Sequence, residues 1–191
     1  MKIGFIGFGK VAKNLTGLID SENITFLTSA QNRSENTIEN MKKSDVKILD
    51  TFKEVAAFSD ILISANSPSQ ALDIAAEYGK YSKGIYMDLN NISPKTTLKI
   101  NEYVDNFVDG AIIGKIDAAN PVLYLSGKNL EKLDFLDDFL EVHKISENPG
   151  DVSKLKLLRS MYTKSLSAVL MESLETVSYT HLRAHETLSD L

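Results

Sequence analysis

Short apolar segments alternate with amphipathic segments along the first half of the chain. The apolar segments are rich in β-branched and aromatic residues and end at turn-forming residues, which is typical of buried strands. Strands are expected at residues 2–7, 24–29, 46–49, 60–65 and 84–89. Helices are expected after them, at residues 10–19, 35–44, 52–58, 69–79 and 95–104. Strands that alternate with helices of this length predict βαβ units and a largely parallel sheet.

The alternation changes in the second half. Two further strands, 106–114 and 121–127, follow each other without a long helix between them, and 129–142 has the pattern of an amphipathic helix. Pro149-Gly150 is a plausible break, after which Asp151 or Ser153 can cap a long helical pattern. We therefore predict an α/β fold with a Rossmann-type, doubly wound, mainly parallel sheet in residues 1–148, followed by a separate helical segment.

A glycine-rich segment, "GFGKVA", joins the first strand to the first helix. It comprises Gly7, Phe8, Gly9, Lys10, Val11 and Ala12. Gly7 permits a tight turn, Gly9 lets the backbone approach a pyrophosphate, and Ala12 keeps helix and sheet close. The helix N-terminus then offers N–H groups and a positive dipole to phosphates. A strand before and a helix after this motif favour a dinucleotide site over a purely structural turn.

The end of the second strand bears on the choice of nicotinamide cofactor. NAD sites usually place an acidic residue about 20 residues past the glycines, against the ribose hydroxyls. Here the strand ends near Ser29, and the first acidic residue after Glu22 is Glu35. Arg33 stands in this gap and can pair with a 2′-phosphate. The pattern favours NADP over NAD. The alternative is that Arg33 is simply a solvated residue of the loop.

Composition excludes several classes of function. The net charge is −5, which does not favour binding to nucleic acid or to an anionic membrane. No apolar run is long enough to span a bilayer, and the N-terminus does not read as a signal peptide. Cysteine is absent, which excludes disulfides and thiol chemistry and is compatible with the cytoplasm, where we expect the protein.

Several blocks resemble one family. The chain contains, in this order, "MKIGFIGFGKVAKNL", "YMDLNNISP", "FVDGAIIG", "LYLSG" and "SKLKLLRSMYTKSLSAVLMESL". Together they resemble the β-hydroxyacid dehydrogenase superfamily of 3-hydroxyisobutyrate and 6-phosphogluconate dehydrogenases, and most closely a little-characterised branch of NAD(P)-binding proteins. The resemblance runs from Met1 to about Glu175 and implies reversible hydride transfer between NADP, or NAD, and a small hydroxy acid.

The resemblance also implies site residues. Lys156 falls on the position of the family's acid/base lysine, and Ser160 stands where an asparagine is common. Asn90 and Asn91 replace the Ser-Thr pair of the loop that contacts substrate and nicotinamide, and Ile113-Gly114 replaces Ser-Gly. Residues 65–68, with Asn66 and Pro68, match the loop near the nicotinamide ring.

Helical spacing gives independent support for the lysine. Lys156, Ser160, Thr163 and Lys164 share one helical face, beside a separate apolar face. A nearby cation or burial can lower the pKa of a lysine toward neutrality, as acid/base chemistry requires. The alternative is that these residues form a solvated basic face without a catalytic role. Lys164 is the second candidate for the acid/base lysine. The resemblance implies that Asn90, Asn91, Gly114 and Ser160 serve the substrate, and the basic face adds Lys164 to them.

The last residues differ from everything before them. His181, His185 and Glu186 have ligand-like spacing, but no further ligand cluster accompanies them, so no metal is expected. Residues 177–187 instead back-translate without conflict into a sequencing-library adapter. We interpret 177–191 as a non-native tail, and 149–176 as the first helix of a truncated helical domain. The full-length form is expected to be a homo-oligomer.

Two other functions stay open from sequence. A non-catalytic dinucleotide-binding module has the same glycine loop, because fold does not determine function. An imine- or F420-linked reductase is a further alternative on the same scaffold.

Overall fold

A computed structural model describes residues 1–114 and 121–189, and the side chains of residues 1–114 and 121–177. The chain divides into two compact units, Met1–Lys154 and Leu155–Leu191, and each is described by itself. None of the described helices combines the length and the apolar character that crossing a bilayer requires.

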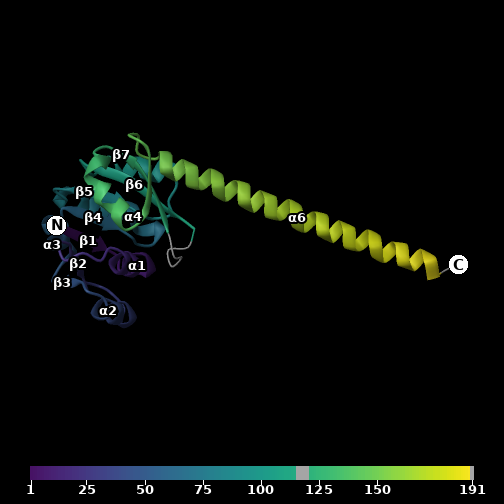
Figure 1. The fold of residues 1–191 in the computed structure, drawn as a ribbon, viewed down its shortest axis with the longest axis horizontal. Helices are drawn as coiled ribbons and strands as arrows, with labels where there is room; N and C mark the ends of the chain where they lie inside the picture. The colour runs from purple at the N-terminus through teal and green to yellow at the C-terminus, as the bar shows by residue number, and fades with distance from the viewer. Residues whose placement is uncertain (115–120, 190–191) are drawn as a thin grey trace. The chain divides into compact units, whose positions relative to one another are not determined.

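The first unit is built on an eight-stranded sheet with the order β3-β2-β1-β4-β5-β6-β7-β8. Figure 1 labels its strands β1 to β7. The strands are β1 Lys2–Ile6, β2 Thr25–Ser29, β3 Lys47–Leu49, β4 Ile61–Ser64, β5 Ile85–Asp88, β6 Phe107–Ile113, β7 Val122–Gly127 and β8 Glu141–Ser146. Strands β1 to β6 all run parallel to one another, β7 is antiparallel to β6, and β8 is parallel to β7. The order of β1 to β6 is that of the doubly wound dinucleotide-binding fold, which confirms the predicted fold class.

Helices cover both faces of the sheet. The helices of the first unit are α1 Lys10–Leu18, α2 Glu35–Lys42, α3 Phe52–Phe58, η1 Pro68–Gln70, α4 Ala71–Tyr78, η2 Gly79–Tyr81, α5 Pro94–Ile100 and η3 Leu130–Asp138. Of the last helix, α6 Asp151–Ser189, only the first turn belongs to this unit. One buried cluster joins alternate strand residues, such as Ile3 and Phe5, to α1, α2 and η3. A second joins the intervening residues, such as Ile6 and Leu62, to α3, α4 and α5. A strand buried on both faces reads as a continuous apolar run, which is why β1, β4 and β5 were predictable.

Local capping fixes where several helices begin. The side chains of Ser34, Thr51 and Ser93 each accept a hydrogen bond from a backbone N–H of the first turn of α2, α3 and α5. At Thr51 the Glu54 side chain returns the bond, which completes a capping box. Pro68 occupies the first position of η1, as expected for the start of that helical segment.

The amphipathic helix predicted for residues 129–142 is confirmed only over its first part. The structure has a 3₁₀ helix, Leu130–Asp138, followed by strand β8. Leu130, Leu133 and Leu136 are buried at a strict spacing of three, which matches the three residues per turn of a 3₁₀ helix. Strand β8 lies at the edge of the sheet and is largely exposed, so its sequence lacks a clear alternation of apolar and polar residues.

The second unit consists of α6 beyond its first turn. Its described side chains from Met161 to Val177 are exposed, and they include Leu166, Val169 and Leu174. The side chains of residues 178–191, which hold most of the predicted tail and both of its histidines, lie outside the described residues.

Candidate functional site

The glycine loop follows β1 and has the geometry that its sequence predicts. Gly7 has a φ of +97°, and a Cβ built there would lie 2.4 Å from the Ala65 carbonyl oxygen and 2.5 Å from Asn66 Oδ1. Glycine is therefore required at position 7, both by its backbone conformation and by the loop after β4. A Cβ at Gly9 would meet nothing within 4 Å, so the backbone there faces open space.

The neighbouring residues hold this loop in place. Phe8 is buried and packs edge-to-face on Phe5, with ring centroids 6.0 Å apart. Ala12 is completely buried, which keeps α1 close to the sheet, while Val11 packs partly against the core. Lys10, the first residue of α1, is exposed.

The N-terminus of α1 fits a phosphate group. Gly9 is its N-cap residue, and in the described part of the chain no side chain caps it. Uncapped N–H groups and the helix dipole favour an anion, and the absent Cβ at Gly9 leaves room for one. The residues present therefore fit the pyrophosphate of a dinucleotide.

The loop after β2 carries the predicted ribose-side residues. Ser29 is buried; its hydroxyl donates to the Asp50 carbonyl at 3.1 Å and accepts from the Gln31 N–H at 3.2 Å. Asn32 takes a left-handed conformation with a φ of 56°. Arg33 is half-buried and lies over the Phe52 ring, with its Cζ 4.7 Å from the ring centroid. Ser29 thus holds the loop in its conformation, and Arg33 gives the loop a positive charge.

The ends of β4 and β5 are joined by a buried polar network. Asn90 donates from Nδ2 to Ser64 Oγ at 2.9 Å and to Asp88 Oδ2 at 2.8 Å. Its Oδ1 accepts the Asn66 N–H at 2.6 Å. Asn66 Nδ2 also reaches Ser64 at 3.3 Å, and Asn66 Oδ1 is buried without a partner among the described residues. Since a Cβ at Gly7 would touch that same oxygen, the network adjoins the glycine loop.

The residues predicted to contact the substrate or the nicotinamide ring differ in whether they are open to a ligand. Asn90 is only 6% exposed, and its amide is committed to Ser64, Asp88 and Asn66. Asn91, by contrast, is exposed, as are Pro68 and Gly114. Asn90 therefore orders the loop, and Asn91 is the member of the pair that is open to a ligand.

Asp88 is buried beside this network. Its two carboxylate oxygens accept the Asn90 N–H at 2.9 Å and the Asn90 side-chain amide at 2.8 Å. Burial raises the pKa of Asp88 from its ordinary value near 3.8 to about 6; hydrogen bonds from Asn90 and Ser64 oppose the rise, and the nearby Asp109 adds to it. This carboxyl is therefore expected to change charge near pH 6.

The Asp88 titration predicts how stability depends on pH. Because folding raises this pKa, the contribution of Asp88 to stability is fully present below about pH 3.8 and is lost as the pH rises through about 6. The loss is expected to be on the order of 3 kcal/mol between pH 4 and pH 7. Urea unfolding across this range compares wild type with Asp88→Asn, whose unfolding free energy should lack this decline. Parallel pH curves for the two proteins would contradict the prediction.

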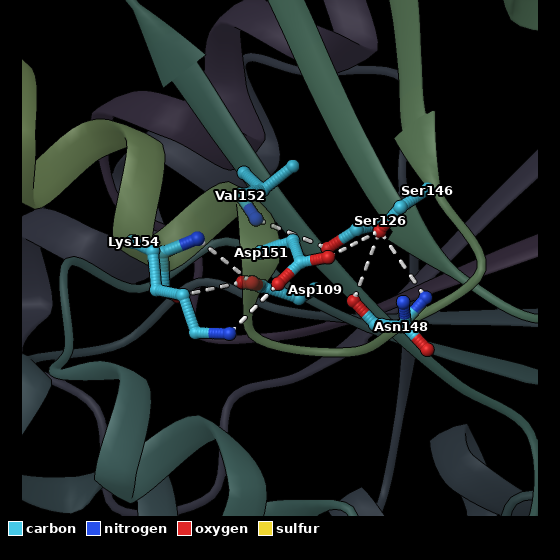
Figure 2. A network of polar contacts seen from close by, with 8 residues as sticks. Asp109, Ser126, Ser146, Asn148, Asp151, Val152 and Lys154 are labelled. Atoms are coloured by element: carbon cyan, nitrogen blue, oxygen red, sulfur yellow. Dashed lines mark hydrogen bonds and ion pairs between the residues drawn. The ribbon is translucent and has the colours of Figure 1, made fainter.

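A second buried carboxylate, Asp109, holds the first turn of α6. Asp109 Oδ2 accepts the Ser153 N–H at 2.9 Å, and Oδ1 accepts the Ser153 hydroxyl at 2.8 Å. Ser126 Oγ accepts the Val152 N–H at 3.2 Å, and Thr97 Oγ1 lies 2.9 Å from Ser153 Oγ. Figure 2 shows Asp109 and Ser126 beside this turn. Burial raises the pKa of Asp109, and these donors oppose the rise.

The start of α6 is also fixed from the loop before it. Ser146 donates to Asp151 Oδ2 at 2.8 Å, and Lys154 Nζ donates to Asp151 Oδ1 at 2.8 Å (Figure 2). The Gly150 carbonyl accepts the Lys154 N–H at 3.0 Å, so the helix begins directly after Gly150. Asp151 thus joins the loop before the helix to Lys154 in its first turn, and Ser153 binds Asp109 on β6.

The predicted residues of α6 belong to the second unit. Lys156 and Ser160 are half-buried and Lys164 is exposed. Sequence reasoning missed Asp88 and Asp109 as a pair. The available signal was an aspartate near the end of each of two expected strands, in "YMDL" and "FVDG". Among the described residues, no group of three or more His, Asp and Glu side chains is placed to hold a metal ion.

Comparison with known families supports a nucleotide-binding role. A family model described as NADP oxidoreductase, coenzyme F420-dependent, matches residues 2–91. An uncharacterized 28.5 kDa protein in the 7S RNA 5′ region of Methanothermus fervidus is 47% identical over 175 residues; the match covers 90% of this chain and 69% of that protein.

Solved structures give the same fold. MTH1747, a conserved protein of unknown function with structural similarity to 3-hydroxyacid dehydrogenases, is 36% identical and has a TM-score of 0.84, covering 91% of this chain and 68% of that one. A 3-hydroxyisobutyrate dehydrogenase of Mycobacterium tuberculosis (13% identity, TM-score 0.71, 85% and 60% coverage) shares the fold alone. So does an imine reductase of Myxococcus stipitatus in complex with NAD⁺ (20% identity, TM-score 0.69, 88% and 63% coverage).

Proposed function

Since the chain belongs to the superfamily of 3-hydroxyisobutyrate and 6-phosphogluconate dehydrogenase-like NAD(P)-binding oxidoreductases, we propose that it serves hydride transfer between NADP(H) and a small hydroxy acid. The observation that carries the nucleotide half of this proposal is the glycine loop. Gly7 has the positive φ and close backbone contact that only glycine tolerates, and Gly9 leaves open space at an uncapped helix N-terminus. When bound, the nicotinamide supplies or accepts the hydride.

The proposed preference for NADP rests on charge at the end of β2. In the described part of the loop, Arg33 is the basic residue and Glu35 is the first acidic residue after Glu22. A ribose 2′-phosphate would meet a cation there, without a carboxylate at the position that NAD-specific sites use.

Lys156 is the proposed acid/base for the hydroxyl proton. It lies on α6, shortly after the first turn that Asp109 and Ser126 hold. Asn91 and Gly114 are exposed residues of the first unit and are the proposed substrate contacts there, with Ser160 and Lys164 the candidates on α6. This chain covers 69% of its relative from Methanothermus fervidus, so turnover is best measured on a full-length gene product.

A reductase acting on an imine, or between NADP and coenzyme F420, is the second candidate. The description of the matching family model favours the F420 reaction. An imine reductase shares the fold of this chain, so an imine is the other substrate class to test. In either case the nucleotide loop keeps the same task, and the difference lies in the second substrate.

The first test is a binding measurement on the 191-residue chain. NADPH fluorescence is expected to change on binding, and NADH to bind at least about tenfold more weakly, because a charged hydrogen bond to the 2′-phosphate contributes about 1.5–3 kcal/mol. Hydroxy acids, cyclic imines and F420 are then offered to the full-length gene product. NADPH binding without turnover of any substrate would favour a non-catalytic module, and equal affinities for NADPH and NADH would contradict the NADP assignment.

A further inference from the structure

The loop after β2 is attached to the start of α3 by three contacts. The Ser29 hydroxyl donates to the Asp50 carbonyl at 3.1 Å. The Phe52 N–H donates to Gln31 Oε1 at 3.4 Å. The Arg33 guanidinium lies over the Phe52 ring at 4.7 Å. The conformation of this loop therefore depends on where α3 begins.

Phe52 is a rigid support for the guanidinium. It is the first residue of α3, lies between Thr51 and Glu54 of the capping box, and is 3% exposed. The Tyr78 ring packs against it at 6.0 Å in an edge-to-face arrangement. A ring held by both the core and a cap does not follow the motion of an exposed arginine, so it restricts that arginine instead.

The positive charge of Arg33 is not neutralised locally. In the described part of the chain no carboxylate forms an ion pair with it, and its Nε is buried without a hydrogen-bond partner. Burial lowers the pKa of Arg33, although a guanidinium stays protonated at neutral pH. A partly desolvated, unpaired cation is costly, and an anionic ligand would remove that cost.

The surface groove next to this loop is also positively charged. A shallow groove of about 240 Å³ runs from Gln31 past Thr51 to the end of α4, and Lys53, Lys80 and Glu77 line it. Both lysines lie over the Tyr81 ring, at 4.7 and 5.2 Å. Two cations and one carboxylate leave this groove positive, and it begins at Gln31, two residues before Arg33 in the same loop.

We propose that Phe52 is a specificity-determining positioning residue, whose ring fixes the Arg33 guanidinium for the 2′-phosphate of NADP. This inference rests on the proposed function. A free arginine loses rotamer freedom when it binds a phosphate, and stacking on Phe52 removes part of that loss in advance. The planar guanidinium suits both the stack and a two-point phosphate contact. NADH, which lacks the 2′-phosphate, gains nothing from it.

The experiment compares dissociation constants for NADPH and NADH by fluorescence titration of the 191-residue chain. Phe52→Leu is expected to weaken NADPH binding on the order of fivefold, in line with the loss of a partly buried cation–π contact, and to change NADH binding by less than about twofold. Phe52→Tyr keeps the ring and should retain the wild-type ratio. Phe107→Leu is the matched control, because Phe107 is 2% exposed and belongs to the same core cluster.

A double-mutant cycle tests the route of the effect. In an Arg33→Gln background, Phe52→Leu is expected to leave the ratio of the two constants unchanged, because the phosphate contact is already gone. If Phe52→Leu does not fold by circular dichroism, Phe52→Met takes its place as a volume-conserving core residue.

The outcomes separate this inference from the proposed function. If Arg33→Gln abolishes the preference for NADPH while Phe52→Leu and Phe52→Met keep it, Phe52 does not position the guanidinium, and the NADP assignment stands. If wild type itself shows no preference for NADPH, the NADP assignment falls and this inference falls with it. A fall in the ratio for Phe107→Leu equal to that for Phe52→Leu would also overturn the inference.

Discussion

Gly7→Ala is expected to abolish NADPH binding and to lower the free energy of unfolding by about 2–4 kcal/mol. An alanine at a φ of +97° is strained by roughly 1–3 kcal/mol. Its Cβ would also lie 2.4 Å from the Ala65 carbonyl oxygen, so the backbone of one of the two loops must move. Urea unfolding gives the loss of stability, and NADPH fluorescence gives the loss of binding.

Gly9→Ala provides the matched control. The φ at Gly9 is −91°, which alanine adopts, and its Cβ would meet nothing within 4 Å. Stability should therefore fall by less than about 1 kcal/mol, the usual cost of alanine at an N-cap. NADPH binding should nevertheless be lost, because the methyl group would occupy the place of the pyrophosphate. Wild-type affinity in Gly9→Ala would show that the pyrophosphate does not lie over this residue.

Lys156→Ala is expected to lower kcat by about 10²- to 10⁴-fold, the range for removal of a general acid/base. The dissociation constant for NADPH should stay within about twofold of wild type, because the proposed role concerns the hydroxyl proton and not the nucleotide. The measurement uses steady-state kinetics on the full-length gene product, with the substrate that the panel identifies.

Two other lysines of α6 sharpen this test. Lys154 is exposed and pairs with Asp151 at 2.8 Å, so Lys154→Ala should leave kcat within about threefold of wild type. Lys164→Ala examines the second candidate. A large loss of kcat in Lys164→Ala, with little change in Lys156→Ala, would transfer the acid/base role to Lys164.

The parallel part of the fold could be predicted because its strands are buried on both faces. Continuous apolar runs such as those of β1 and β4 have one interpretation when turn residues bound them. The region from Leu130 onward lacks that property. Leucines spaced by three fit a 3₁₀ helix and an α-helix alike over a short distance, and only the packing of η3 against the sheet selects the first.

Missing β8 also hid a pairing. His143 has no partner that the sequence suggests, but β8 places it opposite Tyr124, and its ring lies 4.9 Å from that of Tyr124. It also contacts the Glu141 carboxylate at 2.8 Å. Such contacts depend on which strands are neighbours, and a single sequence does not determine the neighbour of an exposed edge strand.

The site divides in the same way. The glycine loop is local in sequence, so its geometry follows from a few adjacent residues. The Asp88 network is not local, because Ser64, Asp88 and Asp109 become neighbours only through the register of β4, β5 and β6. Asn90 appeared in sequence as a substrate contact, whereas its amide is bound by Ser64 and Asp88. The partner to which a polar side chain bonds can be predicted only when the register of the strands is known.

The attachment of α6 by Asp109 has a consequence for how such genes exchange parts. If two gene segments were joined at residue 148, Asp109 and Ser126 would lose the hydrogen bonds that they accept from the N–H groups of Ser153 and Val152. This loss would leave a buried carboxylate without its donors, which is among the more destabilising defects available to a small domain. A nucleotide-binding module that recombined with a new partner domain would therefore have to carry the first turn of the following helix, through Lys154, as an inherited part of its own fold.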